Sequence, residues 1–384
     1  WRHGGAPVLR DLADHGAVEL LGGPATHPFL PLLEPAVADL ALRTGLDDAR
    51  VRLGRPPGGI WAPECGHAPG LERLYAEAGV THLVVDEATL APTGRPTSAA
   101  WTVGGTDVVA FARDLSVTDL VWSSRTGYPA HPAYRDFHRR DARSGLQLWA
   151  VGDGHGGQGD RPAYDPGAAE RQVRCDAASF VDAVRIRLLS VAERDGGPGL
   201  VVAAYDTELF GHWWHEGPQF VDAVLRLLPE AGVRVTTLAR AAQDGAVRGA
   251  VDLPAGSWGA GKDFRVWAGE PVRPLVDDAY WVQRRLLDVM GEERRAGRLG
   301  ARRADLDQLA RQALLALSSD WAFMITRDQA ADYALRRAAG HTAAFHALAE
   351  QVQHRSPGAL ATAARQRRLD GPFPALDARL LATG

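Results

Sequence analysis

The sequence GLVVAAYDTELFGHWWHEG, residues 199–217, decides the fold class, because an apolar run ends there in a carboxylate and an aromatic, histidine-rich turn. A short uninterrupted apolar run is typical of a strand that is buried on both faces. In parallel α/β proteins the loops that follow such strands carry the reacting groups. Asp206, at the carboxyl end of the predicted strand, is therefore a candidate catalytic residue.

A second strand-like segment presents the other kind of acid. Residues 58–66, GGIWAPECG, place Glu64 at the end of a short apolar run, and a helical pattern follows. Two such carboxylates suit glycoside chemistry, in which one carboxylic acid protonates the leaving oxygen while the other attacks the anomeric carbon or activates water. Trp61, Trp213 and Trp214 offer flat apolar faces for a sugar ring.

Both features also have simpler explanations. An Asp or Glu at a strand end often caps the following helix, but two acids among tryptophans and histidines favour catalysis. His212, His215 and Glu216 spell HxxHE, which matches neither zinc-peptidase order, HExxH or HxxEH. We therefore expect no metal here, and none at residues 153–157, DGHGG, which are typical of a glycine-rich loop.

Four motifs follow one another in order along the chain: ATHPFLP at 25–31, WAPECG at 61–66, YDTELFGHWWHEG at 205–217 and SSDWAF at 318–323. In this order they resemble glycoside hydrolase family 57, and most closely its α-1,4-glucan branching enzymes with a C-terminal domain of the DUF1957 type. The resemblance implies an α/β fold, an incomplete (β/α)7 TIM-like barrel over residues 1–255. It also implies a C-terminal helical domain over residues 256–384 that contributes to the glucan groove.

The resemblance also implies a retaining double displacement, with Glu64 as nucleophile and Asp206 as general acid and base. The acceptor then decides the reaction: water gives hydrolysis, a 4-hydroxyl gives disproportionation, and a 6-hydroxyl gives an α-1,6 branch. We expect a 1,4-α-glucan branching enzyme acting on glycogen, amylose or a maltooligosaccharide, without a cofactor. An α-1,4-glucan hydrolase, a 4-α-glucanotransferase and a non-catalytic glucan-binding protein remain the alternatives.

Further substrate-binding positions are implied by the same motifs. They are His27, Trp61, Arg113, Trp122, His212, Trp213, Trp258, Trp267, Asp320 and Trp321. His27 could equally be a loop residue between prolines, and Arg113 could instead pair with Asp114 or Asp119. Trp101, Trp149 and Trp281 are expected to pack in the core.

The chain also departs from the family pattern. It begins at Trp1 without the first motif, so we expect a fragment or a clipped gene model. Between Val85 and Trp101 the family's branching enzymes have a longer loop with a tyrosine thought to favour transfer, whereas this loop is short and lacks tyrosine. Because excluding water favours a sugar acceptor, the short loop weakens the expectation of efficient branching.

Composition argues against several classes of protein. The net charge of −4 and pI near 6.4 argue against nucleic acid or an anionic membrane as a partner. No apolar run approaches the roughly 20 residues of a membrane span, and Cys65 and Cys175 do not make a disulfide framework. We expect a cytoplasmic monomer or small homo-oligomer. Lys262 is the only lysine beside 42 arginines, a bias typical of a GC-rich genome.

The local pattern predicts alternating strands and helices, then helices alone. Strands are predicted at 17–21, 59–63, 81–85, 108–112, 146–151, 200–205 and 233–237. Helices are predicted at 168–193 and 218–228, a helical bundle between 277 and 354, and a last basic helix after Gly358.

Overall fold

A computed structural model describes residues 4–123, 126–152 and 162–382 of the chain. The chain forms two compact units. Unit 1 comprises Trp1–Arg95, Trp101–Phe111 and Val247–Gly384, and unit 2 comprises Pro96–Ala100 and Ala112–Ala246. Each unit is described by itself below, and the predicted domain boundary at residue 255 stays a prediction.

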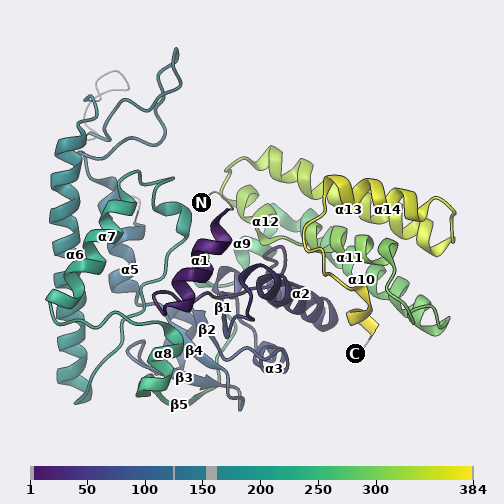
Figure 1. Ribbon diagram of the computed structural model, residues 1–384, viewed down its shortest axis with the longest axis horizontal. Coiled ribbons are helices and arrows are strands. Elements are labelled where there is room, and N and C mark those ends of the chain that lie inside the picture. Colours follow the sequence, from purple (N-terminus) through teal and green to yellow (C-terminus); the bar gives the residue numbers. More distant parts are fainter. Residues whose placement is uncertain (1–3, 124–125, 153–161, 383–384) are drawn as a thin grey trace. The chain divides into compact units, whose positions relative to one another are not determined.

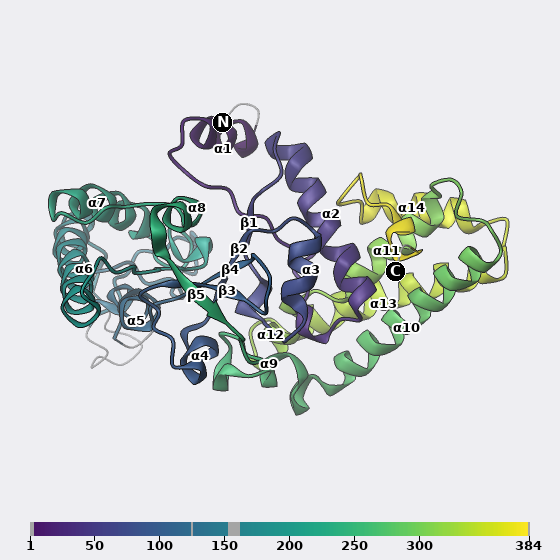
Figure 2. The same ribbon diagram turned by 90° about the horizontal axis from the view of Figure 1, so that it is seen from below.

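A five-stranded mixed sheet has the order β1-β2-β4-β3-β5 (Figure 2). Its strands are β1 (Gly59–Ile60), β2 (His82–Val85), β3 (Ala100–Val103), β4 (Val109–Ala112) and β5 (Val247–Val251). β1 and β2 are parallel, with Gly59 opposite His82, whereas β3 and β4 are antiparallel, with Trp101 opposite Ala110. All residues of β2 and β4 are buried, as their apolar sequences require.

Three of the predicted strands are confirmed, those at 59–63, 81–85 and 108–112, although β1 is shorter than predicted. The strands predicted at 17–21, 146–151, 200–205 and 233–237 are wrong. Segment 200–205 forms no strand; Leu200 donates its N–H to the Ser98 carbonyl, and the Val202 carbonyl accepts the Asp114 N–H. Sequence reasoning missed β3 and β5; β5, VRGAV, is mostly exposed and therefore has no apolar run to detect.

The helices of unit 1 lie mostly in its C-terminal part (Figure 1). They are α1 (Gly5–Asp14), α2 (Pro35–Leu53), α3 (Leu71–Glu77), α4 (Glu87–Leu90), α9 (Arg265–Ala268), α10 (Arg273–Arg295), α11 (Ala304–Ala316), α12 (Ser319–Thr326), α13 (Ala331–Gln353) and α14 (Ala359–Leu369). One apolar cluster joins α2 to α10, α11, α13 and α14, with Leu40, Leu286 and Leu309 fully buried. The predicted helical bundle and basic last helix are confirmed.

Unit 2 is built around its longest helix. Its helices are α5 (Leu115–Trp122), α6 (Pro166–Asp195), α7 (Gly217–Glu230) and α8 (Leu238–Ala241). α6 begins at Pro166, where the Asp165 side chain accepts the Gly167 N–H, and ends before Gly196 in the left-handed conformation. α5, α6 and α7 enclose a core that includes Phe180, Trp214 and Phe220. Both helices predicted in this region are confirmed.

The tryptophans expected in the core have different environments. Trp101 is buried, with 6% of its surface exposed, as predicted. Trp281 is 62% exposed, so the core prediction for it was wrong. The reason is helical geometry: α10 turns Val282, Leu286 and Val289 toward the core, and the neighbouring residue points about 100° away from that face.

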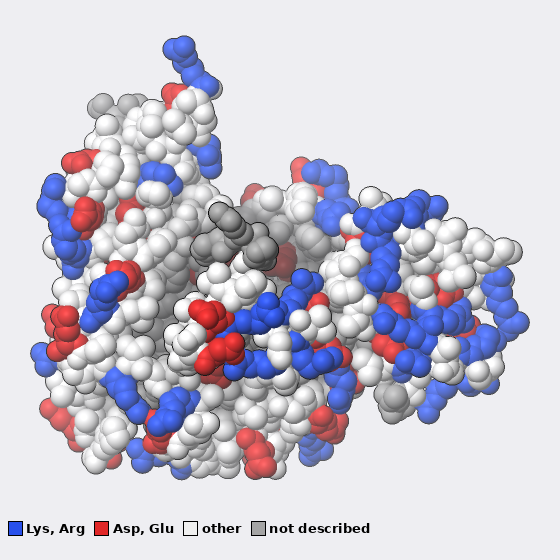
Figure 3. Space-filling model, in the orientation of Figure 1, with Lys and Arg blue, Asp and Glu red and all other residues white. Residues whose placement is uncertain are grey.

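The molecular surface agrees with the modest net charge. On the face shown in Figure 3, arginine side chains are numerous over the C-terminal helices and are interspersed with acidic ones. Within the described residues, no helix combines the length and the apolar character that a membrane crossing requires.

Candidate active site

Glu64 lies where the chain leaves the sheet. β1 ends at Ile60, and a single 3₁₀ turn over Pro63–Cys65 follows. Glu64 and Cys65 both have positive φ angles, 62° and 49°, and so do Thr26 and His27, at 65° and 53°. Such conformations cost about 1–3 kcal/mol for residues other than glycine and gather at functional sites. Two of the motifs singled out in the sequence therefore contain strained backbone.

Hydrogen bonds fix both oxygens of the Glu64 carboxylate, which is only 6% exposed. Ser319, at the start of α12, donates its hydroxyl to Oε1 at 2.8 Å. The Trp258 indole N–H donates to Oε2 at 2.7 Å, and the Trp258 backbone N–H donates to the Glu64 carbonyl at 2.9 Å. Charge-assisted bonds of this length are the strong ones, so the carboxylate has one defined orientation.

The charge state of Glu64 reflects opposing influences. Burial raises the pKa of its carboxyl, and the negative charge of Asp320 adds to that rise. The charge of His27 and the hydrogen bonds from Ser319 and Trp258 act in the opposite direction and favour the carboxylate. Glu64 is thus a desolvated group whose ionised form depends on these neighbours.

His27 is the nearest predicted substrate-binding residue. Its Nδ1 lies 3.9 Å from Glu64 Oε1 and 3.0 Å from the Ser319 hydroxyl oxygen, while 40% of the side chain is exposed. Its carbonyl accepts the Ser319 N–H at 3.0 Å. This arrangement leaves part of the side chain accessible to a ligand and also ties the loop to α12, so both interpretations of His27 stand.

The predicted groove tryptophans of unit 1 have unequal access to a ligand. Trp61 and Trp258 are half-buried and meet edge to face with ring centroids 5.0 Å apart. Trp267 is only 3% exposed and stacks on Phe29 at 4.5 Å in an apolar cluster. Gly66 lies against the Phe29 ring: a Cβ added at Gly66 would come within 2.6 Å of it. Trp267 thus packs within this apolar cluster, and its predicted substrate-binding role stays a prediction.

Asp320 and Trp321 follow Ser319 on α12. Asp320 is exposed and accepts the Ser318 hydroxyl at 2.9 Å. Trp321 donates its indole N–H to the Leu315 carbonyl at 2.9 Å and stacks on His341. Asp320 acts on Glu64 through its charge, whereas the polar atom of Trp321 is already bound within the protein.

Asp206 is placed in unit 2 by the segment that the sequence highlighted. It is partly exposed and precedes the 3₁₀ turn Thr207–Leu209, and its own carbonyl accepts the Leu209 N–H at 3.2 Å. Its side chain does not cap this turn. Tyr205 beside it donates its hydroxyl to the Val117 carbonyl at 3.3 Å, and burial raises the pKa of that phenol.

An aromatic cluster lies immediately after Asp206. Trp213 is 40% exposed and packs on Phe137 with ring centroids 4.5 Å apart, and the His212 ring lies 5.1 Å from Phe137. Trp214, in contrast, is fully buried in the core of unit 2. The sequence identified His212 and Trp213, but Phe137 carries no local signal that would have found it.

The other predicted residues of unit 2 differ in exposure. Trp122, the last residue of α5, is 45% exposed. Arg113 is only 4% exposed, and its charge acts on Tyr205. Asp114 pairs with Arg187 at 2.7 Å.

Metal binding finds no support in the described part of the chain, where no group of three His, Cys, Asp or Glu side chains could hold an ion. The glycine-rich run 153–157 lies outside the described residues. Glu216 is buried instead as a structural acceptor, taking the Arg135 N–H at 3.2 Å.

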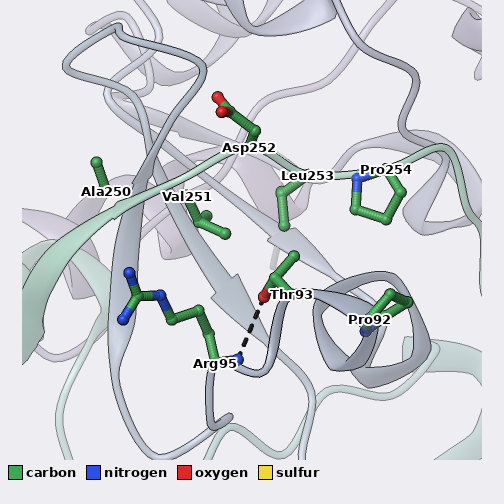
Figure 4. Close-up of a pocket in the computed structure, with 8 residues that line it drawn as sticks. All are labelled: Pro92, Thr93, Arg95, Ala250, Val251, Asp252, Leu253 and Pro254. Atoms are coloured by element: carbon green, nitrogen blue, oxygen red, sulfur yellow. Dashed lines mark hydrogen bonds between the residues drawn. The ribbon is translucent and has the colours of Figure 1, made fainter.

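A separate pocket of about 660 Å³ lies in unit 1 and contains none of the predicted site residues (Figure 4). Its lining comes from the segment after α4 and from the end of β5 with the residues that follow: Pro92, Thr93, Arg95, Ala250, Val251, Asp252, Leu253 and Pro254. The Arg95 N–H donates to the Thr93 hydroxyl at 3.3 Å, and the Arg95 guanidinium lies over Trp101.

Comparison with known proteins agrees with this fold. Residues 1–254 match glycosyl hydrolase family 57, and residues 279–381 match the C-terminal domain of 1,4-alpha-glucan branching enzymes. A probable 1,4-alpha-glucan branching enzyme of Mycobacterium tuberculosis is 50% identical over 99% of this chain and 73% of its own length.

Solved structures resemble the chain over nearly all of its length. The family 57 branching enzyme of Thermococcus kodakaraensis, solved with glucose and additives, is 31% identical, with a TM-score of 0.90 over 97% of this chain and 74% of that one. The branching enzyme of Pyrococcus horikoshii is 30% identical, with a TM-score of 0.89 over 98% and 73%.

An α/β unit with a buried carboxylate among tryptophans, continued by a helical C-terminal part, defines a carbohydrate-active enzyme of the glycoside hydrolase class. The chain belongs to glycosyl hydrolase family 57 and carries the C-terminal domain of its branching enzymes. The predicted family and fold class are thereby confirmed.

Proposed function

We propose that this protein is a 1,4-α-glucan branching enzyme, in which Glu64 is the nucleophile and Asp206 is the general acid and base. The observation that carries the proposal is the buried Glu64 carboxylate, held by Ser319 and Trp258 beside His27. A nucleophile needs one fixed orientation and an exposed path to the anomeric carbon. The relatives named as branching enzymes favour branching over hydrolysis as the reaction.

The proposed reaction has two displacements. Glu64 attacks the anomeric carbon while Asp206 protonates the departing glycosidic oxygen, which leaves a glucan ester on Glu64. Asp206 then takes the proton of an acceptor 6-hydroxyl, whose oxygen attacks the anomeric carbon; the α-1,6 bond forms, the bond to Glu64 breaks, and the Glu64 carboxylate is released. Retention of configuration requires the two carboxyl groups to lie about 5–5.5 Å apart during the reaction.

The substrate is an α-glucan, in keeping with the open aromatic faces of the two units. Trp61 and Trp258 in unit 1 and Trp213 in unit 2 retain exposed surface on which pyranose rings can stack. We propose glycogen, amylose or a maltooligosaccharide as donor, a monomer or small homo-oligomer as the active form, and a cytoplasmic location.

Incubation with amylose distinguishes the candidate reactions. Branching lowers iodine absorbance and produces short chains after debranching without a matching rise in reducing ends. Reducing ends without new branches would identify a hydrolase, and new chain lengths without branches would identify a 4-α-glucanotransferase. Retained glucan binding with no product in any assay would refute catalysis. Proton NMR of the first product tests retention of the α configuration.

A further inference from the structure

The loop 256–263, which carries Trp258, is held on several sides. Gly256 and His67 exchange backbone hydrogen bonds of 2.9 and 3.0 Å, and the Trp258 N–H binds the Glu64 carbonyl. Within the loop the Ser257 hydroxyl donates to the Asp263 carbonyl at 2.6 Å. What remains is the Trp258 carbonyl, and it accepts the Lys262 ammonium at 3.3 Å. Every backbone group of Trp258 thus has a defined partner.

Lys262 reaches this carbonyl because the chain reverses just before it. Gly261 and Lys262 have consecutive positive φ angles, 77° and 59°. Glycine adopts such a conformation freely, whereas a lysine there is strained and persists only when its surroundings determine it. The reversal brings the ammonium back under Trp258, where it lies 3.2 Å from the Asp86 carboxylate.

Asp86 is the second group that binds the Lys262 ammonium. It follows β2, is fully buried, and uses its two oxygens differently: Oδ1 accepts the Ala88 N–H at the start of α4, and Oδ2 accepts Lys262. A buried carboxylate needs a cation as partner, since an unpaired one costs several kcal/mol. Asp86 therefore ties Lys262 to a rigid strand end.

A neighbouring ion pair shows what an ordinary pair looks like. Arg265 and Asp263 meet at 2.7 Å, but both side chains are more than half exposed, at 65% and 51%. Such exposed ion pairs contribute little to the stability of the protein. The Lys262 pair differs because its acid is buried and because its ammonium also holds the backbone of Trp258.

We infer that Lys262, held by Asp86, is a positioning residue that fixes loop 256–263 and thereby keeps the Trp258 indole on the Glu64 carboxylate. This inference rests on the proposed role of Glu64. The bond path runs from the buried end of β2 through Asp86, Lys262 and Trp258 to Glu64. A misplacement of about 1 Å at a reacting group can cost roughly 100-fold in rate.

Activity separates this role from simple charge burial. Lys262→Met should lower kcat by about 10-fold or more with KM changed less than about 3-fold, while Lys262→Arg should restore much of the loss. Arg265→Met, the matched surface control, should stay within about two-fold of wild type. Asp86→Asn/Lys262→Met also removes the buried charge of Asp86, so the melting temperature should recover while kcat stays low.

Recovery of kcat in the double variant, an Arg265→Met loss equal to that of Lys262→Met, or a loss confined to KM would overturn the positioning role. A second readout needs no turnover: fluorine NMR of the protein labelled with 5-fluorotryptophan, with the Trp258 resonance assigned by Trp258→Phe. Lys262→Met should move or broaden that resonance and Arg265→Met should not; an unchanged resonance refutes the inference. If the wild-type protein has no activity, the proposed function fails, but this resonance still decides the role of Lys262.

Discussion

At the residue scale, the burial of Glu64 gives opposite predictions for activity and stability. Glu64→Gln should lower kcat by about 10³-fold or more, because an amide cannot form the glycosyl ester. The same change should leave thermal stability equal or higher at neutral pH, since it removes a desolvated charge. Product analysis on amylose and thermal unfolding at pH 7 check both. Intact turnover in Glu64→Gln would exclude Glu64 as the nucleophile.

Ser319 offers a prediction of pH dependence. Its hydroxyl stabilises the Glu64 carboxylate and so lowers a pKa that burial raises. Glu64 must be ionised to attack, so activity is lost as pH falls through its folded-state pKa. Ser319→Ala should raise that pKa further and move the acidic limb of the kcat/KM profile to higher pH.

The acidic limb is the informative part, because a loss of kcat/KM that is equal at all pH values would contradict this electrostatic role. Ser318→Ala is the matched control, since the Ser318 hydroxyl binds Asp320 and not Glu64. Its acidic limb should move less than that of Ser319→Ala.

Sequence reasoning found single acids and aromatic residues near strand ends but not their partners. The Asp206 and Glu64 motifs are continuous stretches of sequence and can therefore be recognised from the sequence alone. The bonds from Trp258 and Ser319 to Glu64 span 194 and 255 residues, and nothing in a one-dimensional pattern joins such positions. Trp267 is only 3% exposed, and its role in substrate binding stays a prediction.

At the element scale, Gly45 determines how closely α2 approaches the segment before His27. A Cβ at Gly45 would collide with the backbone of Gly23, Pro24 and Ala25. Gly45→Ala should therefore destabilise the protein by about 1–3 kcal/mol despite the better helix propensity of alanine. Urea unfolding measures the change.

Gly291 and Gly340 are matched controls, because they lie in the helices α10 and α13 and a Cβ at either position meets nothing within 4 Å. Alanine at these sites should stabilise by about 0.5–1 kcal/mol. A stabilising Gly45→Ala would show that α2 can move away from the segment that leads to His27.

Strands were harder to predict than helices for a physical reason. The long amphipathic helices α6 and α10 repeat their pattern over several turns, whereas the strands span only two to five residues. Segment 200–205 has the composition of a strand but forms only scattered backbone bonds, and β5 forms a strand with a mostly exposed sequence. Pairing with neighbours decided both cases.

At the scale of the whole molecule, two buried histidines predict the response to acid. Burial lowers the pKa of His67 and of His341, so the folded protein resists protonation that the unfolded chain accepts. Their contribution to stability is complete above the ordinary pKa of about 6.5 and is lost as pH falls below it toward the lowered folded value. The free energy of unfolding should therefore decrease between pH 7 and 5.

Glu64 contributes with the opposite sign, because a raised carboxyl pKa gives stability as pH falls. His341→Gln tests the histidine contribution. It replaces the ring that meets Gln312 at 2.9 Å, and it should flatten the slope of unfolding free energy against pH even if overall stability falls. A slope identical to that of the wild-type protein would show that His341 does not drive the acid response.

A protein with one lysine also has unusual surface chemistry. Amine-directed reagents, whether fluorophores, crosslinkers or activated supports, normally scatter over many side chains, but here they have Lys262 and the chain's terminal amine as targets. The Lys262 side chain is only about a third exposed, and its ammonium binds the Asp86 carboxylate and the Trp258 carbonyl. Attachment of a reagent there would compete with these two contacts. Coupling at Lys262 would therefore act on the loop of Trp258, and coupling through the exposed Cys175 thiol avoids this.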